Sequence, residues 1–422
     1  MDVKPKFTER KYLITLVFVT VIFMFWGIAI TLGDVLNRHF QHVLKISKAH
    51  SGLVQLSIFG AYAVMGVPAG LFMKRFGYKN GVLLGLFLYS AGAFLFVPAA
   101  NAESFDFFRV ALFILACGLA TLETVAHPFV AAMGDQRTSD QRINLSQAFN
   151  GLGGVVGPLI GSYFILKAGQ VHSNDLIAVK NLYIVIGCAI ALIGLLFLFV
   201  KVPALTDPHV IATDSYAIPG KIDGDKKLFH HKHFVFAAIA QLFNVAAQGG
   251  TWAYFINYGH EIMHLSDEKA GYFFSLSMIM MMIGRFAGTF LMRFIAPYKL
   301  LSIFALANII MCIIVAQGFG IISFIALLFI NFFFSIMFPT IFSLGLKNLG
   351  KQTQKASSFI VMGVVGGGIF PPLMGLIANH NVATAYYLPI ICYIVIFLFG
   401  FMYPRLNKNL ERNNVAPPLI QA

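Results

Sequence analysis

Two acidic side chains fall inside long apolar stretches of the chain, where a charge is costly. Asp34 lies late in the first stretch and Glu123 lies within the fourth. A charge at mid-bilayer costs about 2.5–3.5 kcal/mol on insertion scales, so such residues are candidates for function. A carboxyl group removed from water holds a proton more tightly and releases it when wetted. The pair predicts a proton route in which the two carboxyl groups each bind the proton. The alternatives are a capping role for Asp34 and a structural pairing for Glu123.

Two basic side chains also lie within apolar stretches. His127 follows Glu123 by one helical turn, on the same face, and an imidazole titrates near neutral pH. We therefore expect His127 to tune the pH response. Arg285 lies about two turns before Arg293. We expect it to anchor a helix end or bind helix-end carbonyl groups, with direct substrate contact as the alternative.

Amide side chains recur at helical spacing in several apolar stretches. Gln147 and Asn150 follow Asn144 at steps of three, and a second stripe runs from Gln241 to Thr251. Amides offer paired donors and acceptors, and aromatic rings cover the apolar faces of sugars. The alternative is that the amides bond helices together. The candidate substrate-binding residues are Trp26, Thr31, Glu123, Gln147, Asn150, Asn244, Gln248 and Trp252.

The elements that must position these residues are apolar runs of bilayer length. We predict twelve spanning helices, and such long runs without alternation exclude a membrane β-barrel. Their approximate ranges are 12–36, 50–73, 80–99, 106–130, 143–167, 179–200, 233–258, 270–292, 299–318, 321–345, 356–378 and 384–403.

Composition agrees with a membrane protein. Of the 422 residues, 58% are hydrophobic and 11% are charged, and the mean hydropathy is +0.79. A soluble domain carries about a quarter charged residues, so soluble enzymes and nucleic-acid-binding proteins are disfavoured. The net charge of +13 resides mainly in loops on the side of both termini. The positive-inside rule therefore predicts cytoplasmic termini in a multi-pass bacterial inner-membrane protein.

The chain divides into two similar halves. We expect a six-helix bundle over 1–202, a cytoplasmic linker over 203–232, a second bundle over 233–405 and a cytoplasmic tail over 406–422. Three short motifs recur between the halves at nearly one offset, such as Gly161 with Gly375. Parallel repeats around a central cavity are typical of secondary transporters. The histidines at 230–233 carry only a weak indication of zinc, and the four cysteines fall in apolar runs.

Glycine and proline mark candidate gating or structural positions. Gly70 and Gly77 fit a tight turn around Arg75, and Pro128 interrupts the fourth helix. The run GxxxGPxxG at 153–161 is similar to a signature of drug and proton antiporters. Its alternative role is close helix packing.

Several motifs together carry a family resemblance over nearly the whole chain. They are LETVAHPF at 122–129, NLSQAFN at 144–150, and a run over 339–368 that contains PTIFSLGLKNLG, SSFIVM and GGG. The sequence resembles the L-fucose:proton symporter group of the major facilitator superfamily, which includes glucose/galactose permeases. The resemblance implies proton coupling and sugar recognition by Asp34 and Glu123, and sugar contacts by Gln147 and Asn150. The chain departs from the family pattern at His127, where Asn is usual, and at Lys74, where an acid is usual.

The sequence thus predicts an all-α membrane protein of the major facilitator fold. Its expected function is proton-coupled import of a neutral sugar, L-fucose or a related hexose, by alternating access. We expect no enzymatic activity and no cofactor or metal, with the proton as coupling ion and a monomer in contact with membrane lipid. No ATP-binding motif is present. The alternatives are a proton-coupled antiporter that exports an amphipathic compound, and a membrane receptor or scaffold without transport.

Overall fold

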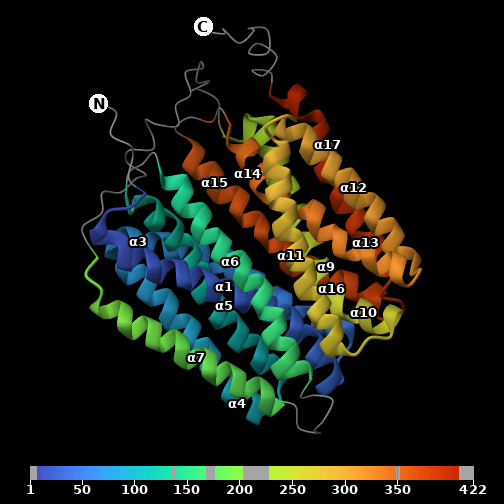
Figure 1. Cartoon of the computed structure of the whole chain (residues 1–422), viewed down its shortest axis with the longest axis horizontal. Helices are drawn as coiled ribbons and strands as arrows, with labels where there is room; N and C mark the ends of the chain where they lie inside the picture. Colours follow the sequence, from blue (N-terminus) through green and yellow to red (C-terminus); the bar gives the residue numbers. More distant parts are fainter. Residues whose placement is uncertain are drawn as a thin grey trace.

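The described part of the chain is all-helical. The computed structural model describes residues 7–134, 138–167, 176–202, 228–347, 349 and 352–407, and within these ranges no strand is present. Eleven helices are long and apolar enough to cross a membrane. The chain is therefore a multi-pass membrane protein (Figure 1).

The helices fall into two groups along the sequence (Figure 1). The first group is α1 (Arg10–Val43), α2 (Lys48–Ser51), α3 (Leu53–Phe94), α4 (Phe96–Asn101), α5 (Phe105–Ala132), α6 (Ser139–Gly161), continued by a π-helical turn at Ser162–Leu166, and α7 (Leu176–Phe199). The second is α9 (Lys232–Ala253), α10 (Phe255–Met263), α11 (Asp267–Leu291), α12 (Pro297–Gln317), α13 (Ile321–Phe334), α14 (Met337–Leu346), α15 (Thr353–Met362), α16 (Gly366–Ala378) and α17 (Leu388–Leu406). Most of the predicted linker over 203–232 and tail over 406–422 lies outside the described residues.

The long helix α3 contains two of the predicted spanning runs. Gly77 interrupts it with φ 82° and ψ 170°, a conformation that glycine adopts without steric cost. Gly70 before the break lies beside Thr124, and Gly81 after it lies beside Val125. Because these neighbours are adjacent in α5, the two arms of α3 reach the same depth and the chain reverses at Gly77. The predicted runs 50–73 and 80–99 thus both fall within the single candidate span Lys48–Asn101.

Each half has its own apolar core. One cluster of buried side chains extends from Tyr12 to Phe197, all in the first half. The other contains residues from Leu228 to Tyr403, joined by Val35, Val155 and Leu166 of the first half. The first-half residues in the second cluster mark where the halves pack together.

Helix pairing repeats between the halves. In the first half, the glycines of α6 let its backbone approach α1 closely, as Gly153 does at Met24. In the second half, the glycines of α16 approach α9 in the same way, as Gly366 does at Leu242. The motif offset in the sequence predicts this correspondence, because it aligns Gly161 of α6 with Gly375 of α16.

The two ends of the molecule differ in how the halves meet. We call the end that holds the start of α1 and the end of α17 the terminal end, and the opposite end the distal end (Figure 1). Hydrogen bonds and ion pairs between described residues of the two halves lie at the distal end. They include Asn37 Nδ2 to the Ala253 carbonyl at 2.5 Å, Asn257 Nδ2 to Gln41 Oε1 at 2.6 Å, Arg38 to Asp267 at 2.9 Å and Lys48 to Glu261 at 2.8 Å. The distal end is therefore closed.

Candidate functional site

A polar and aromatic cluster lies in the middle of the first half. His127 on α5 is its centre: Nδ1 lies 2.9 Å from the Glu123 carbonyl oxygen, and Nε2 lies 2.6 Å from Gln147 Nε2 on α6. A backbone carbonyl only accepts, so Nδ1 carries a proton. In the neutral ring Nε2 is then the acceptor for the Gln147 amide. The predicted residues Glu123, His127 and Gln147 are thus brought together, and all three are half-buried.

Aromatic rings from α1 form one wall of this cluster. Phe23 and Trp26 both meet the His127 ring edge-to-face, at centroid distances of 5.1 and 6.1 Å. The Trp26 indole nitrogen donates a 2.7 Å hydrogen bond to the hydroxyl of Tyr62 on α3. Asn150 Nδ2 donates to the Phe23 carbonyl oxygen at 3.2 Å, and the side-chain oxygen of Asn150 takes no part in this hydrogen bond. The first half therefore supplies amides, a carboxyl group and aromatic faces within one cluster.

Asp34 lies on the same helix as Trp26, about 12 Å further along its axis. Its side chain is 2% exposed, and Gln55 Nε2 on α3 donates to Asp34 Oδ1 at 2.5 Å. Between described residues, no ion pair reaches this carboxyl group. Asp34 is thus enclosed below the closed distal end, separate from the cluster around His127.

The second half contributes less to this cluster than the sequence predicts. Of the amide stripe on α9, Gln248 alone is half-buried, whereas Gln241 and Asn244 are fully buried. The amide atoms of Asn244 have no hydrogen-bond partner among the described residues. Gln241 and Asn244 are therefore enclosed in this conformation, in which α9 packs against α14, α16 and α17.

Trp252 is also placed differently from the prediction. Its side chain is 6% exposed, and its indole nitrogen donates to Asn331 Oδ1 on α13 at 2.8 Å. Asn331 in turn donates to Ser277 of α11. Trp252 therefore ties helices of the second half together, and its contact with substrate stays a prediction.

Thr31 lies at a contact between two helices, and its predicted role in substrate binding stays a prediction. It is 2% exposed, and its hydroxyl donates to the Gly27 carbonyl in its own helix at 3.0 Å. Gly157 of the GxxxGPxxG run lies directly against it, so that a Cβ at Gly157 would collide with the Thr31 hydroxyl. Thr31 and the glycine run thus belong to the contact between α1 and α6, and close packing accounts for the run.

The remaining predicted positions lie outside the cluster. Gly77 makes the turn, while Gly70 lies in regular helix and Arg75 is exposed with its guanidinium over the Phe76 ring. Pro128 lies inside α5, where its missing N–H leaves the Thr124 carbonyl without its usual helix bond. Arg285 is exposed, and no hydrogen bond joins its guanidinium to a described residue. The predicted binding of helix-end carbonyls by Arg285 is therefore absent here.

Two residues of the site escaped the sequence prediction, namely Gln55 and Tyr62 of α3. They are seven residues apart, which puts them on one helical face with Phe59 between them. Phe59 packs against Gly367 of the second half. A polar residue and a tyrosine at this spacing inside an apolar run were the signal that could have found them.

Metal ligation has little support in the described residues. No group of three or more His, Cys, Asp or Glu side chains is arranged to hold a metal ion there. His233 Nε2 lies 2.8 Å from the Lys347 carbonyl oxygen, and the His231 ring lies 5.9 Å from that of His233. This part of the histidine cluster thus packs against a loop of the second half.

The fold and the half-buried polar cluster define the class as a multi-pass protein with the architecture of a secondary transporter. The sequence model of the Major Facilitator Superfamily matches residues 13–370. The chain is 37% identical to the L-fucose-proton symporter of Escherichia coli (strain K12), covering 93% of each chain. It is 33% identical to the glucose/galactose transporter of Brucella abortus, covering 94% of this chain and 95% of that one.

A solved structure gives the same result. The crystal structure of the major facilitator superfamily transporter FucP in the outward conformation matches with a TM-score of 0.66. The identity is 35%, and the match covers 93% of this chain and 99% of that one. The chain belongs to the major facilitator superfamily.

Proposed function

We propose that this protein is a secondary transporter, and not an enzyme, that imports a neutral hexose or 6-deoxyhexose together with a proton. The observation that carries the proposal is the cluster of Glu123, His127 and Gln147 beneath two aromatic rings. Its amide and carboxyl groups match sugar hydroxyls, and its rings match the apolar face of a sugar. The relatives named for L-fucose and for glucose and galactose support this substrate class. No cofactor is needed beyond the coupling proton.

The proposed membrane arrangement follows the charge distribution. Twelve crossings, with the terminal end in the cytoplasm of a bacterial inner membrane, put most Lys and Arg on the inner side. The moving bodies are the bundles over 1–202 and 233–405, connected by the linker over 203–232, with the tail over 406–422 also inside. A monomer surrounded by lipid suffices for this mechanism.

With this orientation, the closed distal end corresponds to an inward-facing state. Asp34 is then shut off from the outer solution by the contacts of Asn37 and Arg38. An ionised carboxylate enclosed without a cation is costly, whereas the neutral acid is tolerated. We infer that Asp34 takes its proton while the distal end is open, and that closure follows protonation.

His127 links protonation to sugar binding through Gln147. When the ring is neutral, the Gln147 amide donates to Nε2 and directs its carbonyl oxygen away from the ring. When the ring is protonated, Nε2 donates, and the amide must turn to present its oxygen to the ring. The Gln147 group that points away from the ring then changes from an acceptor to a donor. Glu123 lies one turn from His127 on α5, and Tyr62 of α3 accepts from Trp26, whose ring meets that of His127.

The direction of transport is import. One charge moved across about 100 mV supplies about 2.3 kcal/mol, enough for roughly 50-fold accumulation of a neutral solute. The alternative of an exporter rested on the GxxxGPxxG run and on the 44 Phe residues, and the α1–α6 contact gives the run a packing role. The relatives whose names include symport also favour import over export.

Transport into proteoliposomes tests the proposal. Radiolabelled L-fucose, galactose and glucose are supplied outside, with and without an inward proton gradient. We expect gradient-dependent accumulation of at least one sugar. Extrusion of an amphipathic dye, with no uptake of any sugar, would refute the proposal.

A further inference from the structure

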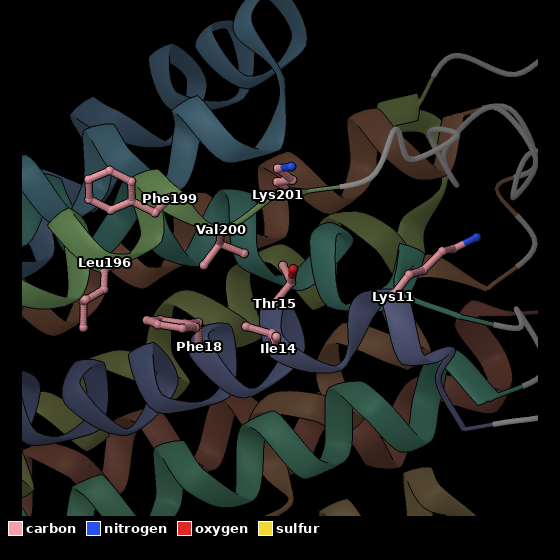
Figure 2. A pocket seen from close by; sticks show the side chains of 8 residues that line it. All are labelled: Lys11, Ile14, Thr15, Phe18, Leu196, Phe199, Val200 and Lys201. Carbon is pink, nitrogen blue, oxygen red and sulfur yellow. The ribbon is translucent and has the colours of Figure 1, made fainter.

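A groove lies on the surface of the first half, between the beginning of α1 and the end of α7. It has a volume of about 340 Å³ and lies at the terminal end, remote from the cluster around His127. Figure 2 shows its lining, with Leu196 and Phe199 toward one end and Lys201 and Lys11 toward the other. The groove thus has an apolar part and a cationic part.

The apolar part faces outward, where lipid surrounds a membrane protein. Ile14 is 64% exposed and Phe199 is 78% exposed, although both are large apolar side chains. Phe18 closes the floor, where its ring lies 6.0 Å from that of the buried Phe197. A hydrocarbon chain fits such a surface, whereas a small soluble anion gains nothing from it.

The cationic part has more positive charge than its neighbours neutralise. Lys201 makes no ion pair or hydrogen bond with a described residue, whereas Lys11 pairs with Glu9 at 2.9 Å. Both partners of that pair are 53% exposed, so the pair is weak and exchangeable. Lys79 adds a third cation, because its ammonium group donates to the Leu198 and Val200 carbonyls at the end of α7.

Thr15 supplies an independent indication of a ligand. It lines the groove, its side chain is 1% exposed, and its hydroxyl has no hydrogen-bond partner among the described residues. Other helical threonines of this chain, Thr121 and Thr124, donate to the carbonyl one turn earlier. A buried hydroxyl left without a partner is costly, so an acceptor oxygen from outside the protein would satisfy it.

We propose that this groove binds an anionic phospholipid. The phosphate group lies between Lys11 and Lys201, an ester or phosphate oxygen accepts from Thr15, and one acyl chain runs along Ile14, Phe18 and Phe199. A zwitterionic lipid would bring its own cation to a site where Glu9 is the one nearby acid among the described residues. The site therefore distinguishes phosphatidylglycerol from phosphatidylcholine. Bound there, the lipid joins α1, which carries Trp26 and Asp34, to α7.

Native mass spectrometry of the full chain in detergent tests this site. The protein is titrated with phosphatidylglycerol or phosphatidylcholine of matched chain length. We expect phosphatidylglycerol to be retained more strongly, and Lys11→Gln with Lys201→Gln to weaken it by at least about tenfold. Lys45→Gln with Lys269→Gln removes two exposed lysines at the distal end and is the matched control, with retention unchanged.

Two further variants separate the parts of the site. Ile14→Trp fills the groove at an exposed position and is expected to reduce retention with both lysines intact. Thr15→Val removes the hydroxyl at constant shape and is expected to reduce retention severalfold. Equal thermal unfolding of each variant in detergent alone confirms that it is folded.

Three results would overturn the proposal. The first is equal retention of the two lipids, and the second is retention that neither the paired lysine change nor Ile14→Trp reduces. The third is displacement of phosphatidylglycerol by inorganic phosphate, which would assign the site to a soluble anion. None of these measurements depends on which sugar the protein carries.

Discussion

Arg38 of α1 and Asp267 of α11 join the two halves through a 2.9 Å hydrogen bond between Nε and Oδ2. The two side chains are 12% and 15% exposed, so water screens the pair less than a surface pair. His260 Nδ1 lies 2.9 Å from the other carboxylate oxygen of Asp267. Asp267 therefore connects α11 to α1 at the closed distal end, and opening must separate it from Arg38.

Breaking this contact is expected to favour the state with an open distal end. Arg38→Gln removes the charge, and the remaining buried carboxylate is destabilising in the closed state. We expect faster labelling of a single cysteine at the buried Ser51, in a background without Cys117, Cys188, Cys312 and Cys392. The charge exchange Arg38→Asp with Asp267→Arg restores slow labelling. Arg109→Gln breaks an Arg–Asp pair within one helix and leaves the rate unchanged. Unchanged labelling in Arg38→Gln would contradict this role.

Asp34→Asn is expected to separate sugar binding from proton coupling. The amide keeps the shape and can still accept from Gln55, but it cannot carry a proton. Uphill uptake should be lost, whereas counterflow of sugar should persist. Asp106→Asn, at an exposed acid near the start of α5, is the control and keeps uphill uptake. Loss of counterflow as well would make Asp34 a structural or ligand residue.

His127→Asn is expected to flatten the pH profile of sugar affinity. The wild type should bind sugar with different affinity at about pH 5 and about pH 8, because the orientation of Gln147 changes with ring protonation. An amide does not titrate in this range, so the difference should disappear. His127→Phe keeps the packing against Phe23 and Trp26 and removes the hydrogen bond, with affinity falling roughly tenfold. A pH profile of His127→Asn that matches the wild type would refute the link.

The two tryptophans of the chain are expected to report differently on sugar binding. Trp26 lies in the cluster around His127, whereas Trp252 is bonded to Asn331 inside the second half. With Trp252→Phe, the remaining fluorescence of Trp26 should change on sugar addition. With Trp26→Phe, sugar affinity should fall and the signal of Trp252 should respond little. A sugar-dependent change in the fluorescence of Trp252, with little change in that of Trp26, would instead indicate that Trp252 contacts the sugar.

Gly157→Ala is expected to loosen the contact between α1 and α6. The added methyl group meets the Thr31 hydroxyl and the Ile28 backbone, and such overpacking costs about 1–3 kcal/mol. The unfolding temperature in detergent should fall. Gly66→Ala is the matched control, because no heavy atom lies within 4 Å of its added Cβ. Equal unfolding temperatures for the two variants would show that the contact contributes little.

The sequence predicts the helices well and the orientation of their faces only in part. Apolar length alone located the spanning runs, and a charge inside a run marked Asp34 and Glu123. Periodicity showed that Gln241, Asn244 and Gln248 share a face of α9. It could not show whether that face meets a cavity or other helices. Helix packing decides this, and packing depends on residues far away in the sequence, such as those of α16.

The same reason explains why Gln55 and Tyr62 were missed while Gln147 was found. Gln147 belongs to a stripe of amides, which is visible along one helix. Gln55 and Tyr62 belong to the site only through hydrogen bonds to residues of α1. Gln55 donates to Asp34, and Tyr62 accepts from Trp26. The spacing of Gln55 and Tyr62 put them on one face of α3, but the sequence did not show that this face meets α1.

The glycines of α6 bear on how such chains are sorted by motif. Gly153, Gly157 and Gly161 lie within contact distance of Met24, Ile28 and Leu32, one helical turn apart on α1. The GxxxGPxxG run is similar to a signature of drug and proton antiporters. In this chain its glycines allow the backbones of α1 and α6 to approach closely. In this chain the run marks where α1 and α6 pack together, so the run alone does not identify the direction of transport.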